Sequence, residues 1–515
     1  MSEQPLSLGP VGQPASRPRR RPPLGTLLVI ALVAAVTLVG GTLGHPRARV
    51  VSSSQVDVEG ATAVCPDLRQ FKNELSSRAS VGAARPADGQ TGSSGGAIRQ
   101  HANSEPLAVQ RVPITEPGQV AVGLGTALKN DALVFQSTGA LSAGLEAEQV
   151  TRGERGRDRG LAGLRCEAPR TEAWFVGGNT SIGDVTTLVL VNVDDTPSTV
   201  DVTVLSYTGT PDQRPGQGLT INPHSRTVID LDTLAPDRKL LAVHVHSRRG
   251  RVAAALRTST LNGTTALGVD WIPQSVPPAT SVLVPGFPQL DQGSRAVVIA
   301  NPGTDDTVVS LQVSTSDGQF VPAGMDAIRV PAGSTNSVRL DDLAKQSALA
   351  VRVVSAGGPV LAGGFVGDLN QDAPAREFAY TAGSQPLSGP ALLTDLVINR
   401  PTESTLILTA PADAASVRIT LIRVLGTNTS LPKARVVRIP AGRTVTLKLS
   451  TFYRSGADVK LAVEVRPEEG SGPVYAARYL REHGAHGPLT TLLDLRGPEV
   501  AVSRPAVVED PRVGY

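Results

Sequence analysis

Apolar and polar residues follow two patterns along this chain: one unbroken apolar run near the start, and short stretches of strict alternation beyond it. The run at residues 24–43 reads LGTLLVIALVAAVTLVGGTL and holds no charged side chain. A helix of this length spans about 30 Å, which matches the hydrocarbon thickness of a bilayer. The pattern therefore predicts a transmembrane helix over residues 24–43.

Positive charge is unevenly placed around this run. Four arginines precede it and two follow it, namely Arg17, Arg19, Arg20, Arg21, Arg47 and Arg49. The positive-inside rule predicts a cytoplasmic N-terminus, with residues 1–23 as a disordered tail, and a single-pass cell-membrane protein whose bulk is extracytoplasmic. A cleaved signal peptide is the alternative, but the run is longer than a usual signal core and no A-x-A site precedes His45.

The alternating stretches predict β-strands. In TVDVTVLSY, Val200, Val202 and Val204 alternate with Asp201 and Thr203, and VVSLQVSTS and VRITLIRV repeat the pattern. A period of two buries one face of a strand and leaves the other face in water. Turns rich in Asp, Gly and Pro separate these stretches, so we expect an all-β fold after the anchor.

The pattern recurs with a period near 109 residues. The similar segments RVPITEPGQVAV, TINPHSRTVID, RVPAGSTNSVR and RIPAGRTVTLK carry prolines spaced by 110, 108 and 109 residues: Pro113, Pro223, Pro331 and Pro440. Glycines that open apolar runs recur in step, at Gly139, Gly250, Gly358 and Gly472. Repeats at a fixed period indicate tandem structural units. We expect four, over residues 50–165, 166–275, 276–385 and 386–515, the last with a C-terminal extension.

Each unit has the size and strand spacing of an immunoglobulin-like β-sandwich of seven or eight strands. The alternative is a β-propeller with two blades in each unit, for which the chain shows no WD or kelch-type signature. Unit 1 is degenerate, because the flexible stretch ADGQTGSSGGAIRQ occupies the place of its alternating strand. Stacked units would give a rod or a compact scaffold.

Composition excludes some partners. The chain has 49 basic and 46 acidic residues, a net charge of +3, and no basic stripe after Arg21. This balance argues against a nucleic-acid partner, which requires a basic footprint. Aromatic residues make up only 3%, which disfavours a flat aromatic glycan-binding platform. The bias toward Ala, Gly, Val, Arg and Pro is typical of high-GC bacteria.

Two cysteines, Cys65 and Cys166, suit an oxidising compartment in which they could form a disulfide. The bond would close a loop of about 100 residues and would join the weakest unit to its junction with unit 2, with about 4–5 kcal/mol of stabilisation in the chain-entropy model. Two buried free thiols are the alternative. C-x-x-C spacing is absent, which argues against a redox or zinc site.

Several segments resemble an uncharacterised actinobacterial family of N-terminally anchored proteins defined by a domain of unknown function. They are EAWFVGGNTSIGDVTTLVLVNVDD, TVDVTVLSYTG, VIDLDTLAP, GRVAAALRTS and GVDWIP. The resemblance is densest from Cys166 to Gly286 and carries no catalytic residues. It implies an actinobacterial envelope location and, because members are often encoded near envelope glycosyltransferases, a link to surface polysaccharide.

Two short motifs resemble catalytic signatures. GSSGG at residues 92–96 matches the nucleophile elbow, but it lies in a Gly/Ser-rich stretch and not between a strand and a helix, so we interpret it as a linker. Asp230 and Asp232 match the D-x-D of nucleotide-sugar transferases, which requires an α/β nucleotide-binding fold. We interpret them as a turn or a short helix cap.

Histidines and tryptophans give the remaining candidates. His244 and His246 lie two apart on a predicted strand and so share a face. They could hold a metal if a neighbouring strand supplied a third ligand, but we favour a solvated face. His483 and His486 are expected in a loop after the last long strand. Trp271, beside Asp270 at the boundary of units 2 and 3, is expected to fix an inter-unit angle, with ligand recognition as its alternative. Trp174 is expected in the core.

The sequence thus predicts no catalytic, cofactor-binding or metal-binding residue and no cofactor. It lacks a P-loop, a dinucleotide fingerprint and an H-E-x-x-H motif. We expect a non-enzymatic scaffold of the envelope, anchored in the membrane, with an envelope protein or a glycan as partner. An adhesin or glycan binder is the first alternative, and an enzyme with a site at unit junctions is the second.

Overall fold

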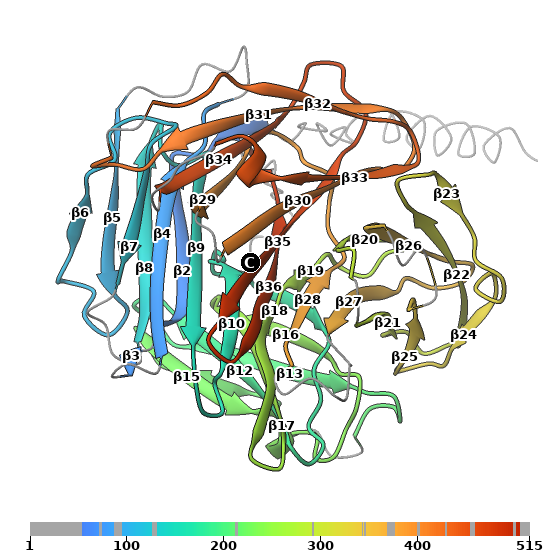
Figure 1. Ribbon diagram of the computed structural model, residues 1–515. Coiled ribbons are helices and arrows are strands. Elements are labelled where there is room, and N and C mark those ends of the chain that lie inside the picture. Colours follow the sequence, from blue (N-terminus) through green and yellow to red (C-terminus); the bar gives the residue numbers. More distant parts are fainter. Residues whose placement is uncertain are drawn as a thin grey trace, which may run out of the picture. The chain divides into compact units, whose positions relative to one another are not determined.

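The computed structural model describes residues 54–504, apart from 69, 72–74, 87–94, 126–130, 212–214, 291–292, 342, 344–346, 368–375, 399–401, 428–429, 454–458 and 498–500. These residues form 37 strands and two single-turn 3₁₀ helices, so the expected all-β fold is confirmed (Figure 1). The transmembrane helix predicted over 24–43 lies outside the described residues. Within them, no helix is long and apolar enough to cross a bilayer.

Most of the described chain, from Val56 to Val502, clusters as one compact unit. Its antiparallel strands pair in four groups, which we call modules 1 to 4. Each module contains an A sheet and a B sheet. A separate two-stranded sheet joins β1 (Ser54–Asp57) to β37 (Ala501–Arg504).

Module 1 has the A sheet β2-β8-β5-β6 and the B sheet β10-β9-β4 with β7 and the short β3. Its strands are β2 (Gly60–Leu68), β3 (Gln70–Phe71), β4 (Leu75–Ala83), β5 (Gly96–Ala102), β6 (Gln110–Val112), β7 (Val120–Leu124), β8 (Asp131–Gly139), β9 (Leu145–Gly153) and β10 (Gly160–Arg165). The prediction of a flexible stretch through AIRQ is wrong, because these residues form β5 and pair with β8.

Module 2 has the A sheet β14-β13-β16-β11-β19 and the B sheet β15-β12-β17-β18. Its elements are β11 (Glu172–Val176), β12 (Asp184–Asn192), β13 (Ser198–Leu205), β14 (Leu219–Ile221), β15 (Ser225–Asp230), η1 (Leu231–Thr233), β16 (Ala242–Arg249), β17 (Ala253–Asn262), β18 (Thr265–Ile272) and β19 (Gln274–Ser275).

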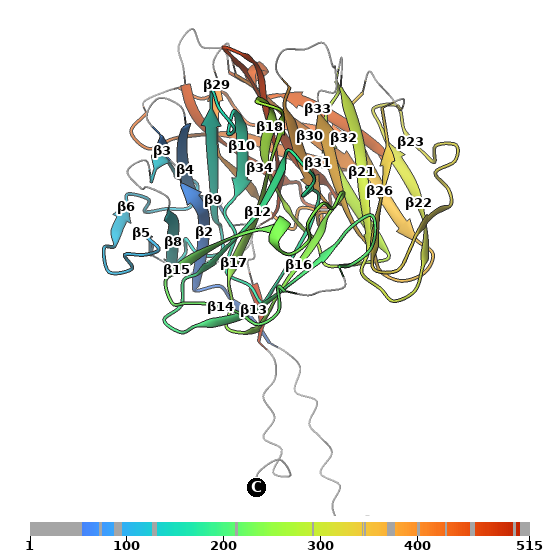
Figure 2. The ribbon, with the colours of Figure 1, turned by 90° about the horizontal axis from the view of Figure 1, so that it is seen from below.

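Module 3 has the A sheet β20-β26-β22 with β23 and β24, and the B sheet β25-β21-β27-β28. Figure 2 shows several of its strands together at the right. Its strands are β20 (Ser281–Phe287), β21 (Ser294–Asn301), β22 (Thr307–Ser314), β23 (Gln319–Phe320), β24 (Ile328–Val330), β25 (Ser334–Arg339), β26 (Leu349–Ser355), β27 (Leu361–Gly367) and β28 (Phe378–Ala382).

Module 4 has the A sheet β29-β34-β31-β32 and the B sheet β33-β30-β35-β36. Its elements are β29 (Ala391–Ile398), β30 (Thr402–Ala410), β31 (Ala415–Arg423), β32 (Arg435–Ile439), β33 (Arg443–Lys448), η2 (Leu449–Thr451), β34 (Val459–Pro467), β35 (Tyr475–Gly484) and β36 (Gly487–Leu495). The strand order corresponds to that of module 2, so the internal repeat is a repeat of topology.

The A and B sheets of a module pack face to face. In module 2, Val200, Val202 and Val204 of β13 meet Leu188 and Leu190 of β12 in one buried cluster. Asp201 and Thr203 face away from it and are only partly buried. The alternating pattern therefore predicted both the strand and its buried face, as a sandwich requires.

A repeated asparagine holds equivalent turns in modules 2 and 3. The side-chain amide of Asn192 donates to the carbonyls of Thr196 and Ile221, at 2.8 and 3.1 Å. Asn301 in module 3 makes the same pair of bonds, to Asp305 and Val330, at 2.8 and 3.1 Å. Each asparagine closes a turn and ties it to the strand beyond, which fixes the crossing from the B sheet to the A sheet.

Cys65 and Cys166 form the expected disulfide. Cys65 lies on β2 of the A sheet, whereas Cys166 directly follows β10 of the B sheet. Both sulfur-bearing residues belong to the buried core of module 1. The bond therefore joins the two sheets of module 1, and Cys166 lies between β10 and β11, at the predicted junction with module 2.

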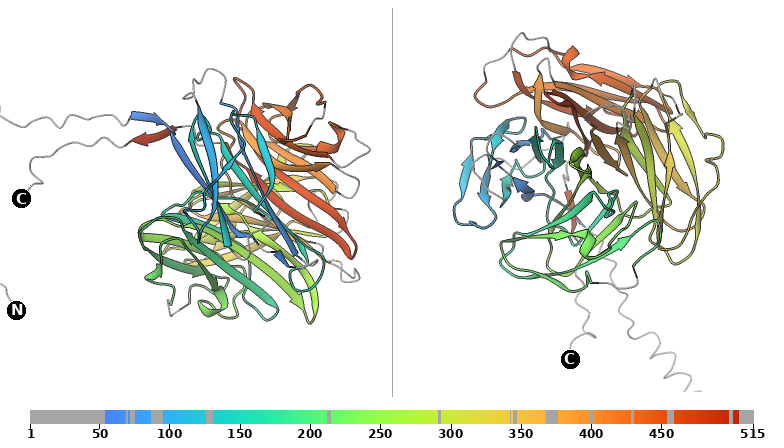
Figure 3. Two further views of the ribbon diagram at one scale, coloured as in Figure 1. Left: turned by 90° about the vertical axis from the view of Figure 1, so that its left-hand side faces the viewer. Right: turned by 60° about the horizontal axis from the view of Figure 1, so that its bottom comes forward.

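The modules also pack on one another through their sheets. Val64 and Ala132 of the module 1 A sheet meet Val189 and Ala253 of the module 2 B sheet. Equivalent apolar clusters join module 2 to module 3 and module 4 back to module 1. The inner strands β10, β18, β28 and β36 contact one another in a closed cycle. Figure 3 (right) shows the differently coloured parts of the chain grouped around a centre. Most B-sheet strands consequently have both faces buried.

This cyclic stacking shares one property with the propeller alternative, because eight sheets follow one another around a centre. The connections differ from those of a propeller blade, in which four consecutive strands form one sheet. Here β11, β13, β14 and β16 belong to the A sheet, while β12, β15, β17 and β18 belong to the B sheet. The units are therefore sandwiches whose chain crosses repeatedly between two sheets.

Candidate functional site

Asp270 lies where the four inner strands meet and is fully buried. One carboxylate oxygen accepts the backbone N–H of Tyr380 at 3.0 Å, and the other accepts the hydroxyl of Thr491 at 2.8 Å. The same Thr491 hydroxyl accepts the backbone N–H of Gly163 at 3.0 Å. Asp270 on β18 thus bonds to β28 and β36, and Thr491 extends the network to β10, so this network links all four modules.

Desolvation governs the charge of Asp270. Burial raises the pKa of this carboxyl group well above its usual range, against the hydrogen bonds donated by the Thr491 hydroxyl and the Tyr380 N–H, which lower the pKa. A group in this state holds its proton at pH values where an exposed aspartate is ionised. The centre of the assembly is therefore kept close to neutral.

Glu377 is a second buried carboxyl group beside this centre, 3% exposed. One of its oxygens accepts the backbone N–H groups of Val269 and Phe378, at 3.1 and 3.3 Å. Burial raises the pKa of Glu377 well above its usual range, and Asp270 nearby adds to the effect. Gly268 has a φ of 135°, and a Cβ there would lie 2.5 Å from Glu377, so the close approach requires glycine.

Charged side chains also meet at the contact between modules 1 and 4. Arg478 of β35 is fully buried, donates to the carbonyl of Asp395 at 2.9 Å and lies 3.5 Å from Glu148 of β9. Burial raises the pKa of Glu148, while Arg478 lowers it. Nearer the surface, Arg152 binds Glu482 at 2.8 Å. These pairs hold the last module against the first.

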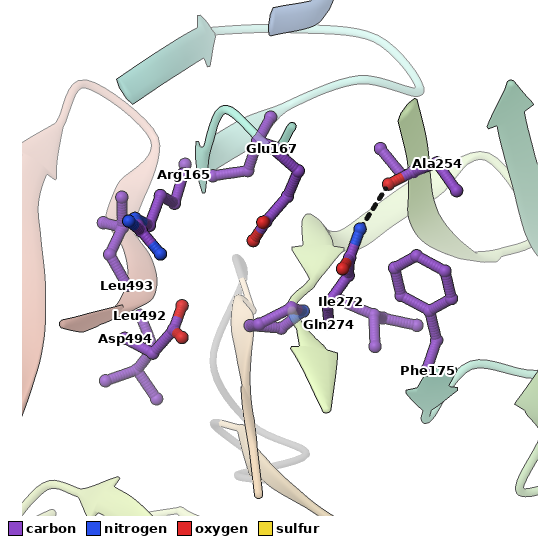
Figure 4. A pocket seen from close by; sticks show the side chains of 13 residues that line it. Arg165, Glu167, Phe175, Ala254, Ile272, Gln274, Leu492, Leu493 and Asp494 are labelled. Carbon is purple, nitrogen blue, oxygen red and sulfur yellow. Dashed lines mark hydrogen bonds between the residues drawn. The ribbon is translucent and has the colours of Figure 1, made fainter. Parts of the chain in front are cut away.

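A small cavity opens where modules 1, 2 and 4 meet (Figure 4). Its polar lining consists of Arg165, Glu167, Gln274 and Asp494. Just beside it, Arg496 donates to Asp494 at 2.5 Å and to Glu167 at 3.4 Å. The free volume is about 20 Å³, enough for a water molecule but not for an organic ligand. These carboxylates are thus bound by arginine and do not form a substrate cleft.

A wider and open hollow lies at the contact of modules 1 and 4, with a volume of about 410 Å³. Its walls come from residues 421–427, which include the end of β31 and the turn after it, together with Arg85, Gly118 and Gln119. The backbone N–H of Leu425 donates to the carbonyl of Val120 at 2.8 Å and closes its base. The lining mixes apolar side chains with Arg85 and Arg423, and it contains no carboxylate.

The two histidines of β16 lie on the same face, as predicted, and Val243 and Val245 point into the core. The neighbouring strand β11 places Trp174 opposite His244 and Glu172 opposite His246. The rings of Trp174 and His244 stack at 3.7 Å between centroids, with an interplanar angle of 5°. Both histidines are partly buried, and the side chain of His246 is 44% exposed, so the face that they share is partly open to water.

The prediction that Trp174 lies in the core is wrong. On β11, Ala173 and Phe175 point into the module 2 core, so Trp174 faces the opposite side and packs at the contact with module 3. Trp271 is 2% exposed and packs between modules 1 and 2. Trp271 thus lies at a contact between units, as expected, but the expectation that this contact joins units 2 and 3 is wrong, because the ring packs against module 1.

The other motifs have structural roles. Most of GSSGG at 92–96 lies outside the described residues. Asp230 precedes the 3₁₀ helix η1 and accepts the Thr187 hydroxyl at 3.0 Å, but its side chain makes no cap bond. His483 belongs to β35 and His486 to the turn before β36. The expected loop after the last long strand is thus a hairpin.

Residues 124–476 match the family DUF5719, which is described as a family of unknown function. The match covers more than half of the chain. The chain belongs to this family. The DUF5719 region runs from the end of β7 in module 1 to the start of β35 in module 4, so it includes modules 2 and 3 completely. The expected membership of an uncharacterised domain-defined family is confirmed.

No curated protein matches this DUF5719 chain. Among solved structures, the protein titled "Crystal Structure of Thermotoga maritima 1070" is similar over 21% of this chain and 96% of its own. The sequence identity is 16% and the TM-score is 0.18. At that TM-score the likeness carries no argument about function.

Sequence reasoning missed most of the buried charged residues. Glu148, Glu377 and Arg478 were not selected, and Asp270 was noted only as the neighbour of Trp271. A signal was present, because β35 reads YAARYLREHG and puts arginine amid apolar residues. A charged residue within an otherwise buried strand requires a partner, but the sequence does not reveal which distant strand supplies it.

Proposed function

We propose that this chain is a non-enzymatic, membrane-anchored scaffold of the actinobacterial cell envelope that binds another envelope component, in service of surface polysaccharide assembly. The helix over 24–43 would anchor it, and modules 1 to 4 would lie outside the cytoplasm. The disulfide between Cys65 and Cys166 supports the second point, because such bonds persist in oxidising compartments.

The observation that carries the proposal is the placement of buried ionisable groups between modules. Asp270 accepts hydrogen bonds from the backbone of β28 and the Thr491 hydroxyl of β36, and Arg478 is held by Glu148 and Asp395. The cavity bordered by Glu167 and Asp494 has room for water alone. Ionisable groups that hold modules together serve rigidity, and a rigid body with large outward surfaces suits a scaffold.

A cleft lined by acids between units would favour an enzyme. Asp270 and Glu377 do converge between modules, but they are 0% and 3% exposed. A general acid or base must come within hydrogen-bond reach of a substrate. Burial of this kind favours a structural role for both groups.

Crosslinking in cells tests the proposal. A photoreactive amino acid would replace exposed residues such as Ile182 on module 2 and Leu107 on module 1, one at a time. We expect one of these positions to capture a specific membrane or envelope protein, while a position in the buried β12 serves as the negative control. Recovery of lipid or peptidoglycan alone would contradict the scaffold proposal.

Retention on isolated cell wall distinguishes the adhesin alternative. A scaffold that acts through a protein partner should not be retained on protein-stripped wall, whereas a glycan binder should be retained and then released by soluble wall fragments. Strong retention would replace the proposed function with glycan binding.

A further inference from the structure

We propose that Glu172, His244 and His246 form a zinc-binding site on the outer face of the module 2 A sheet. One ligand atom from each of the three side chains lies within 4.8 Å of the others. Two imidazoles and one carboxylate are a ligand set that Zn²⁺ accepts, with the fourth position left for water or an external donor. This inference does not depend on the proposed function.

The strand register brings the three side chains together. Because β11 and β16 are antiparallel, Glu172 lies directly opposite His246. His244 is two residues from His246 on the same strand and so projects from the same face. An oxygen of Glu172 lies 3.4 Å from Nδ1 of His246, which is close to the separation of two ligands on a tetrahedral zinc ion.

His244 is prepared to act as a ligand. Its ring is held by the stack on Trp174, which limits its rotation. The Nε2 atom is buried and has no hydrogen-bond partner among the described residues.

The site needs only a small rearrangement. The side chains of Glu172 and His246 are 53% and 44% exposed, so both can turn toward a metal without disturbing the core. Asp201 lies opposite His246 on the other side, but it is bound by Arg248 and by the backbone N–H of Gly218. Glu172 is therefore the carboxylate that remains for the metal.

The repeat provides an internal comparison. On β26 of module 3 the equivalent face carries Arg352 and Val354, and on β34 of module 4 it carries Glu464 and Arg466. The sandwich thus forms without histidines at these positions. The ligand set is particular to module 2 and is not explained by a need of the fold.

Calorimetry on the full-length protein tests the site. The chain would be purified in detergent with a tag free of histidine, stripped with a chelator and titrated with ZnCl₂. We expect one saturable site per chain. Glu172→Gln and His246→Asn should each weaken binding about tenfold or more, since each removes one of three ligands. His483→Asn, at an exposed histidine of module 4, should leave the affinity unchanged.

Cobalt gives a second readout that is independent of heat. Co²⁺ in a tetrahedral site of nitrogen and oxygen ligands shows intense visible absorption, and we expect this signal in the unmodified chain and in His483→Asn but not in Glu172→Gln. Absence of saturable zinc binding would overturn the proposal. Equal losses in His246→Asn and His483→Asn would also overturn it, because they would indicate adventitious binding to surface histidines.

Discussion

The hydroxyl of Thr491 donates a hydrogen bond to Asp270 across 2.8 Å, although 221 residues separate the two positions in the chain. The bond joins β36 of module 4 to β18 of module 2. The same carboxyl group accepts the backbone N–H of Tyr380 on β28, so Asp270 connects the inner strands of modules 2, 3 and 4.

The first prediction concerns this carboxyl group. Because the folded chain raises the pKa of Asp270, it binds the proton more tightly than the unfolded chain, whose aspartate pKa is about 3.9. Stability from this group is therefore present at low pH and is lost as pH rises above about 4, with a slope of at most about 1.4 kcal/mol per pH unit. Asp270→Asn cannot titrate and should remove this slope.

Urea unfolding of both proteins between pH 4 and pH 8, followed by circular dichroism, measures the effect. The stability of Asp270→Asn relative to the unmodified chain should increase with pH. The asparagine amide can donate to the Thr491 hydroxyl. Any change in hydrogen bonding in the variant shifts its free energy of unfolding by the same amount at every pH, so it does not affect the slope. Parallel curves across the range would show that Asp270 keeps an ordinary pKa.

The disulfide gives the second prediction. Cys65 and Cys166 are 101 residues apart, and the chain-entropy model assigns a loop of this length about 4–5 kcal/mol. The double variant Cys65→Ala/Cys166→Ala should lose stability of this order, less any relaxation of the core. Reductant should lower the urea midpoint of the unmodified chain and leave the variant unaffected. A variant as stable as the oxidised chain would rule out this contribution.

A third prediction compares the two tryptophans. Trp271→Ala should destabilise the chain by about 3–5 kcal/mol, because it empties a fully buried position between modules 1 and 2. Trp174→Ala removes a half-buried ring from one face and should cost about 1–2 kcal/mol. Unfolding curves for the two variants test the difference, and equal losses would contradict the assignment of Trp271 to a buried contact.

The fourth prediction concerns the buried pair of Glu148 and Arg478. Removing only one partner leaves an uncompensated buried charge, so Glu148→Gln or Arg478→Met should each cost about 3–5 kcal/mol. The double variant should cost clearly less than the sum of the two single losses. Additive losses in this double-mutant cycle would mean that the two side chains do not interact.

Local pattern was sufficient to predict the strands and their buried faces. Val200, Val202 and Val204 alternate with polar residues because one face of β13 lies in the core and the other does not. The turn at Asn192 and the disulfide were likewise within reach of sequence reasoning. All of these features depend on neighbours within one module.

The contacts between modules could not be derived in the same way. Nothing in the residues around Asp270 indicates that Thr491 is its partner, because alternation reports burial and not the identity of the covering surface. One signal was available in the segment TTLVLVN of β12, which does not alternate between apolar and charged residues. All of its residues are buried. Such a strand is covered on both faces, which implies a second layer beyond its own sandwich.

The closed cycle of modules limits how this protein could have evolved by duplication. An open array of repeats can gain or lose a copy at either end, since each copy contacts only its neighbours. Here β10 of the first module contacts β36 of the last, so every copy has a neighbour on both sides. A fifth copy would have to open the contact around Asp270, and selection would therefore hold the number of copies at four.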